Sequence, residues 1–280
     1  MNAKYVGYRL AQRLSERLPQ RSAFRLAERL ADLQWRWSRN DREAVERNLS
    51  LVLDLPAGPD AGLVRDVFRN FGRYLVEFFT VQQVQQPDIQ VEGFEHFEQA
   101  RRGHRGIIVL TAHVGNWEVG AVVMQRLGLP MTAVALPHGD PQMDRLFNAQ
   151  RQRCGLEVIP LGREAARRSL QSLGDGRSLG LLGDRDFAGN GLRMPFCGYE
   201  MTVPRGPAVL SFRSQAPAVP TFLVREGFWK FRLCFEPPIW PQSGAANEAA
   251  VRMWTQAYLA VFERYVKRFP DQWLMFQRVA

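Results

Sequence analysis

Cysteine is scarce in this chain of 280 residues. Cys154, Cys197 and Cys234 are far apart and odd in number, and no Cys-x-x-Cys spacing occurs. Disulfide frameworks and structural zinc sites need cysteines that are grouped in pairs. We therefore expect neither a disulfide scaffold nor a metal site, and we expect a reducing compartment.

Long apolar runs are also missing. No segment reaches the roughly 18 consecutive apolar residues that a membrane-spanning helix needs, and the first residues lack the apolar core of a signal peptide. Any membrane contact is therefore expected from one side. The chain also has no Gly-rich nucleotide-binding loop and no basic and aromatic repeat suited to stacking bases, so nucleic acid is not an expected partner.

The charge of the chain is strongly basic. A net charge of +9 implies an acidic partner, and more than half of this excess lies in residues 1–50, with eleven Lys or Arg against six acids. Apolar residues recur there every four positions, with arginines between them, at Val6, Leu10, Leu14 and Leu18. The pattern is typical of an interfacial membrane helix and equally of a helical hairpin that packs on its own domain.

The segment 106–120 combines a strand, a loop and a helix start. A β-favouring apolar run at 107–110 indicates a strand buried on both faces. His113 follows it, Asn116 suits a helix N-cap, and Glu118 falls in the first helical turn, where the helix dipole keeps a carboxylate ionised. A carboxylate folded back onto one ring nitrogen makes the other a stronger base. This predicts a general-base dyad; the alternative is a satisfied loop histidine beside an ordinary glutamate.

Strands and helices alternate through the rest of the chain. Apolar runs predict strands at 131–135, 156–159, 178–182, 219–224 and 231–235, and helical spacing predicts helices at 59–82, 140–153, 164–173, 208–214 and 251–269. The segment 189–199 is Gly-rich and shows no clear periodicity. The alternation predicts an α/β fold with a mixed, mostly parallel central sheet flanked by helices. We expect one domain over 1–280, with a helical, membrane-facing region at 1–85.

Polar residues follow two of these elements. Asp184 and Asp186 alternate in an extended segment, so their carboxylates can point together into a cleft, unless they form a loop salt bridge around Arg185. Arg151 and Arg153 lie at the end of the helix 140–153. Arginines there are usually solvated or pair with the helix dipole, and they can also bind an anion.

Five blocks, taken in order, resemble the lipid A late acyltransferase family of lauroyl and myristoyl transferases and the related phosphatidylinositol mannoside acyltransferases. They are Leu-Thr-Ala-His-Val-Gly-Asn-Trp-Glu at 110–118, Asp-Arg-Leu-Phe-Asn-Ala-Gln-Arg-Gln-Arg at 144–153, Leu-Gly-Asp-Arg-Asp at 182–186, Thr-Val-Pro-Arg-Gly-Pro-Ala at 202–208 and Phe-Pro-Asp-Gln-Trp at 269–273. Any single block is unspecific. The ordered set covers most of the chain.

The resemblance implies a glycerolipid-acyltransferase-like fold and an O-acyltransferase. Such an enzyme moves a fatty acyl group from a thioester donor, acyl-CoA or acyl carrier protein, to a hydroxyl of a membrane glycolipid or lysolipid. By analogy, His113 takes the acceptor proton and Glu118 orients the imidazole. Arg151 or Arg153 would bind a phosphate of the donor or the acceptor.

The resemblance also carries over Asp184 as an active-site carboxylate, one that can share the histidine in the mannoside-acylating branch. Asp186 and Arg213 are further candidates for substrate contact. No cofactor is expected beyond the thioester co-substrate.

One departure concerns the membrane. The lipid A enzymes usually begin with a single spanning helix, whereas this chain begins with a broken, arginine-rich one. We therefore expect a peripheral enzyme on an anionic surface, the cytoplasmic face of the inner membrane. Two alternatives stay open: an acyl-thioester hydrolase, in which water replaces the acceptor, and a non-enzymatic basic membrane-binding protein.

Overall fold

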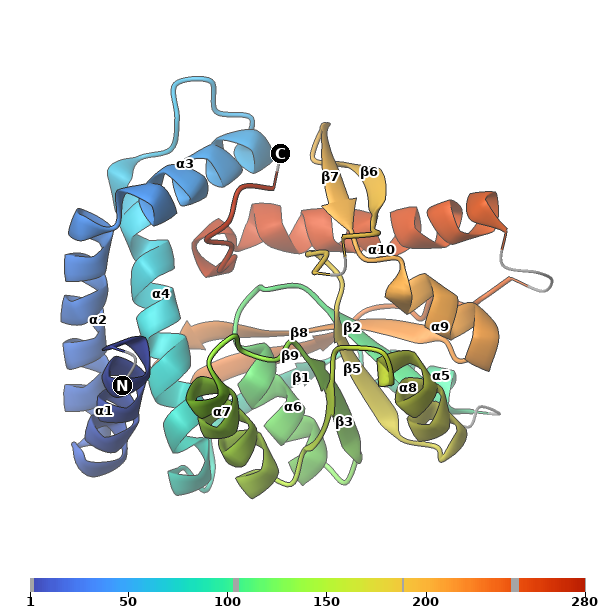
Figure 1. Cartoon of the computed structure of the whole chain (residues 1–280), viewed down its shortest axis with the longest axis horizontal. Helices are drawn as coiled ribbons and strands as arrows, with labels where there is room; N and C mark the ends of the chain where they lie inside the picture. Colours follow the sequence, from blue (N-terminus) through green and yellow to red (C-terminus); the bar gives the residue numbers. More distant parts are fainter. Residues whose placement is uncertain (1–2, 103–105, 188, 243–246, 280) are drawn as a thin grey trace.

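A twisted central sheet organises the protein (Figure 1). The computed structural model describes residues 3–102, 106–187, 189–242 and 247–279. Within them, seven strands pair in the order β1-β9-β8-β2-β5-β3-β4. These strands are β1 (Asp88–Glu92), β2 (Ile107–Thr111), β3 (Met131–Ala135), β4 (Glu157–Pro160), β5 (Ser178–Leu182), β8 (Ala218–Gly227) and β9 (Lys230–Phe235). In this seven-stranded sheet β8 and β9 pair antiparallel and the other neighbours pair parallel, so the predicted mixed, mostly parallel sheet is confirmed.

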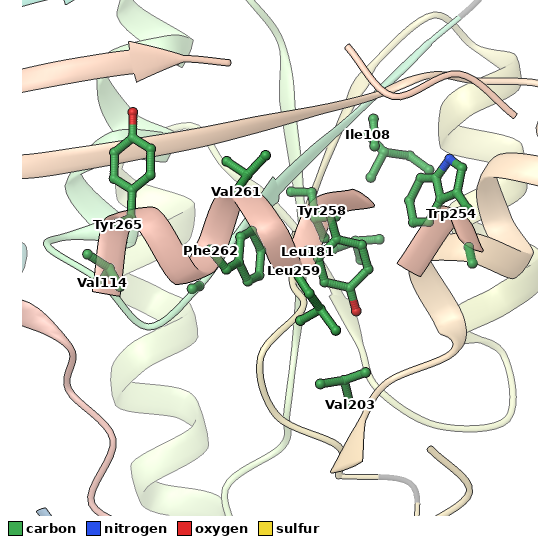
Figure 2. Packing of buried hydrophobic residues seen from close by; sticks show 14 of the residues in the cluster. Ile108, Val114, Leu181, Val203, Trp254, Tyr258, Leu259, Val261, Phe262 and Tyr265 are labelled. Atoms are coloured by element: carbon green, nitrogen blue, oxygen red, sulfur yellow. The ribbon is translucent and has the colours of Figure 1, made fainter. Parts of the chain in front are cut away.

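Strand β2 divides the core between the two faces of the sheet. Ile108 and Leu110 pack in a cluster with helix α10 (Glu248–Arg268), whereas Ile107 and Val109 pack with α6 (Trp117–Arg126). Figure 2 shows Tyr258, Leu259 and Phe262 of α10 in the first cluster. Helices also include α5 (Phe94–Arg101), α7 (Pro141–Arg153), α8 (Ala165–Gly174) and α9 (Gly206–Ser214). Burial on both faces explains why β2 reads as a continuous apolar run.

The N-terminal region consists of helices packed beside one end of the sheet (Figure 1). They are α1 (Ala3–Arg17), α2 (Gln20–Trp37), α3 (Arg39–Leu53), α4 (Ala61–Thr80) and the short η1 (Val81–Gln83). Helix α4 buries one face, including Val67, Phe68 and Phe78, and lies against α2. Among the described helices, none is both long enough and apolar enough to cross a membrane. The membrane-facing role of this region stays a prediction.

A hairpin occupies part of the segment that showed no periodicity in the sequence. Strands β6 (Leu192–Phe196) and β7 (Tyr199–Val203) pair antiparallel, and residues of β6 alternate between buried and exposed. Cys197 and Gly198 form the turn with φ of 50° and 83°, the backbone that tight hairpins require. Pro195 and the flanking glycines conceal this alternation in the sequence.

The C-terminal segment returns to the loop that follows β2. After α10 the chain forms η2 (Pro270–Gln272), and Trp273 then bridges Val114. The Leu274 N–H donates to the His113 carbonyl at 2.7 Å, and the Gly115 N–H donates to the Gln272 carbonyl at 3.0 Å. Residues 271–275 therefore hold the loop that follows β2.

Candidate active site

The loop after β2 places His113 through a tightly constrained backbone. Gly115 has a φ of +69°, and a Cβ there would lie 2.0 Å from the Leu223 carbonyl oxygen, so only glycine fits. Asn116 then caps α6, because its side chain accepts a hydrogen bond from the Val119 N–H at 3.1 Å. The strand, loop and helix start expected from the sequence are thus formed as predicted.

Asp184 is the carboxylate that contacts the His113 imidazole. Strands β2 and β5 are parallel neighbours with Thr111 opposite Leu182, so His113 and Asp184 each lie two residues past the paired ends. His113 Nδ1 lies 2.7 Å from Asp184 Oδ1, and the His113 backbone N–H donates to Oδ2 at 2.8 Å. Trp273 Nε1 also donates to Oδ2, at 3.1 Å.

This arrangement fixes the charge and the proton of the pair. Burial raises the pKa of the Asp184 carboxyl, but the His113 charge and the hydrogen bonds from His113 and Trp273 outweigh it, and the pKa falls below its ordinary value. The side chain of Asp184 is only 1% exposed. An ionised carboxylate at Nδ1 keeps the proton on that nitrogen and leaves Nε2 as the basic atom.

The basic nitrogen of His113 is not engaged by the described residues. The His113 side chain is 13% exposed, and within the described residues Nε2 has no hydrogen-bond partner. The His113 ring packs against the Trp117 indole in a T-shaped arrangement with a centroid distance of 4.9 Å, and Trp117 in turn lies against Tyr74 at 4.6 Å. These aromatic contacts restrict the rotation of the His113 ring.

Glu118 does not hold the imidazole, and the expected His113–Glu118 contact is wrong. In the part of the chain that the structure describes, its carboxylate bonds instead to Arg151, with Nε at 3.1 Å from both oxygens and Nη2 at 2.5 Å from Oε1. The reason is the start of α6: Trp117 faces His113, so the next residue points toward α7. The two side chains are nearly buried, at 6% and 11% exposed.

The Glu118–Arg151 pair is a structural clamp between α6 and α7. Burial lowers the pKa of Arg151, but the Glu118 charge and hydrogen bond outweigh this effect and raise it, so the guanidinium stays charged. Arg151 Nη1 also donates to Asn148 at 2.9 Å. Three of its five N–H groups are therefore engaged within the protein.

The other candidate residues lie apart from His113 or have local roles. Arg153 is exposed, and its guanidinium lies 4.0 Å from Glu16. Asp186 accepts a hydrogen bond from the Gly191 N–H at 2.9 Å, which closes its own loop. Arg213 is exposed in the last turn of α9. Among the described residues, no hydrogen bond or ion pair joins Arg153 or Arg213 to the His113–Asp184 pair.

Two other kinds of site were considered, a serine nucleophile and a metal site. The sequence contains one Gly-x-Ser-x-Gly pattern, at 176–180, but Ser178 is buried in the first residue of β5 and not on a strand-to-helix elbow. It is therefore not placed as a nucleophile. Within the described ranges, no group of three or more His, Cys, Asp or Glu side chains is placed to hold a metal ion.

Trp273 is the site residue that the sequence did not single out by its chemistry. It lies in the block 269–273 that carried the family resemblance, but it is 89 residues from Asp184. Only that block pointed to it. Neither spacing nor periodicity joins an indole after the last long helix to an acid after β5.

The sequence of the chain belongs to a known class of enzyme. Residues 8–279 match the family described as bacterial lipid A biosynthesis acyltransferase, and the chain belongs to this family. It is therefore an acyltransferase, and the resemblance seen in the five ordered blocks is confirmed.

Two named relatives have the same sequence identity to this chain, 28%. The phosphatidylinositol mannoside acyltransferase of Mycolicibacterium smegmatis is 28% identical over 84% of this chain and 78% of its own length. The lipid A biosynthesis palmitoleoyltransferase of Escherichia coli is 28% identical over 85% of this chain and 78% of its own length. A solved structure, the 1-acyl-sn-glycerophosphate acyltransferase of Thermotoga maritima, aligns at 16% identity and a TM-score of 0.39 over 81% of this chain and 98% of that one.

Proposed function

We propose that the protein transfers a fatty acyl group from a thioester, acyl-CoA or acyl carrier protein, to a hydroxyl of a membrane glycolipid or lysolipid, with His113 as the general base. The observation that carries this proposal is the 2.7 Å contact between His113 Nδ1 and the buried Asp184 carboxylate, with Nε2 left without a hydrogen-bond partner among the described residues. The names of the relatives, which act in mannoside and lipid A acylation, support a glycolipid acceptor.

The chemistry follows from the proton on His113. Nε2 takes the proton of the acceptor hydroxyl as its oxygen attacks the thioester carbonyl carbon, and the new C–O bond forms. The tetrahedral intermediate then expels the thiolate by breaking the C–S bond, and the thiolate receives the proton from Nε2. Asp184 stabilises the imidazolium that exists between these two transfers.

Glu118 and Arg151 act in this proposal as positioning residues. Their clamp holds α7 against α6 and so fixes the helix that begins directly after the histidine loop. Because Arg151 has most of its donors engaged, binding of a donor or acceptor phosphate stays a prediction for the exposed Arg153 rather than for Arg151.

The N-terminal helices are the proposed membrane contact, at the cytoplasmic face of the inner membrane. Exposed arginines on α1 and α2 lie beside exposed apolar side chains. These apolar residues are Val6, Leu10, Leu30, Leu33 and Trp37. Exposed aromatic and aliphatic side chains next to arginines favour adsorption to an anionic lipid surface. This would bring the site to its lipid acceptor.

The test is a direct search for the acylated product. Purified protein is incubated with a bacterial membrane lipid extract and, in separate reactions, acyl-CoA or acyl carrier protein donors of several chain lengths. Mass spectrometry then follows lipids that gain one acyl group. We expect an acylated lipid with the wild-type protein and none with His113→Gln. Release of free fatty acid without any acylated lipid would contradict the proposal and favour a thioester hydrolase.

A further inference from the structure

A cleft lies beside the segment 271–275 that holds the His113 loop. Its volume is about 400 Å³, within the range of sites for small molecules. Its walls come from α2, α4, the turn between β8 and β9, and η2. In Figure 1 the end of β8 reaches the pair of helices α2 and α4 at this end of the sheet.

Four arginines line this cleft. Arg21 and Arg25, one helical turn apart on α2, both face it, together with Arg73 of α4 and Arg225 of β8. Among the described residues, Arg21 and Arg25 have no carboxylate partner within salt-bridge distance. The Arg21 guanidinium lies over the Phe228 ring, 5.3 Å from its centroid, which leaves its N–H groups free for an anion.

The other two arginines are held in fixed positions. Arg73 pairs with Glu28 at 2.7 Å, and Arg225 makes a buried bidentate pair with Glu77 at 2.6 and 2.7 Å. Both also donate to Asn70 Oδ1, at 3.0 and 2.9 Å. The base of the cleft is therefore preorganised, and a ligand would not have to order it on binding.

The cleft also offers acceptors. Asp271, Glu226 and Glu28 line it beside the arginines, and Asn70 Nδ2 donates to the Asp271 carboxylate at 2.9 Å. A bare anion would be repelled by these carboxylates. A phosphate ester of a small polyol would satisfy both kinds of group, because arginine forks match phosphate oxygens and carboxylates accept bonds from hydroxyls.

We propose that this cleft binds a phosphorylated polyol, such as a glycerol phosphate group, through Arg21 and Arg25. Such a group occurs both in free metabolites and in the headgroups of anionic phospholipids, and the same two arginines would recognise either source. The site would be separate from His113, although Gln272 lines the cleft while its backbone carbonyl accepts a hydrogen bond from the Gly115 N–H.

The test is a binding measurement that needs no acyl transfer, so its outcome is independent of the proposed function. Calorimetric titrations use glycerol 3-phosphate, inorganic phosphate, glycerol, and dihexanoyl phosphatidylglycerol below its micelle concentration. The cleft variant is Arg21→Gln/Arg25→Gln. The matched control is Arg101→Gln/Arg102→Gln, which removes the same charge from exposed positions at the end of α5. Thermal unfolding checks that both variants fold.

We expect glycerol 3-phosphate to bind more tightly than inorganic phosphate, and glycerol alone not to bind. The cleft variant should weaken binding at least about tenfold, the scale of lost bonds to a charged group, while the control stays within about twofold of wild type. Binding of the lipid alone would support the site with a headgroup as its source, and binding of the free ester alone would support a metabolite. The proposal is overturned if no ester binds, if the cleft variant binds like wild type, if both variants weaken equally, or if inorganic phosphate binds as tightly.

Discussion

Asp184→Asn removes the charge of this carboxylate and one of its acceptor oxygens but keeps the size of the side chain. Two donors, the His113 backbone N–H and Trp273 Nε1, both point at Oδ2, so the amide oxygen of an asparagine must take that place. The amide NH2 group then faces His113 Nδ1 and can only donate to it. Nδ1 becomes the acceptor, the ring proton moves to Nε2, and the base is lost.

The size of the effect follows from this tautomer change. In a serine protease triad the wrong tautomer costs about 10⁴ in turnover. We therefore expect turnover to fall by about 10³ to 10⁴, which corresponds to about 4 to 5.5 kcal/mol of activation free energy. The assay is the initial rate of acyl-lipid formation at saturating donor, with the fold checked by circular dichroism. The control is the same change at the exposed Asp175, which should leave the rate within about threefold. A rate for Asp184→Asn within threefold of wild type would refute the reasoning.

Three further predictions concern stability. Because the pKa of Asp184 lies below its ordinary value of 3.8 in the folded protein, its carboxylate stabilises the fold above that pH and this contribution is lost as the pH falls through the lowered pKa. The difference in Tm between wild type and Asp184→Asn should shrink below about pH 3.8, and a constant difference would contradict this. Trp273→Phe keeps an aromatic ring, although a smaller one, and removes the Nε1 donor to Asp184, and urea unfolding should show a loss of about 1.5–3 kcal/mol; no change in the urea midpoint would argue against that bond. Glu118→Gln leaves the Arg151 charge without its partner and should lower the free energy of unfolding by about 3 kcal/mol. The double variant Glu118→Gln/Arg151→Met should recover part of this loss. An unchanged free energy of unfolding in the single variant would show that the clamp contributes nothing.

Local patterns predicted much of the fold. Apolar runs located β2, β3 and β5, and helical spacing located α4, α7 and α10, because burial on one or two faces leaves a direct trace in the order of residues. The hairpin of β6 and β7 left no such trace, since Pro195 and the turn at Gly198 interrupt its short alternation.

Residue patterns located the histidine of the site but not the carboxylate that contacts it. His113 was recognised because it follows a buried strand, but its carboxylate comes from a strand 71 residues later. Spacing along the chain favoured Glu118, whereas the parallel register of β2 and β5 brings Asp184 to the ring. Strand order decides this, and strand order cannot be read from the local pattern of either strand.

The central claim is that the His113 imidazole moves the proton during acyl transfer. The measurement that tests it most directly is the single-turnover rate constant of acyl transfer for His113→Gln, with the lipid acceptor bound first and the reaction started by rapid mixing with the acyl donor. The account predicts a fall of at least about 100-fold with an unchanged fold, the scale of a lost general base. A His113→Gln protein that transfers acyl groups at the wild-type rate would contradict it.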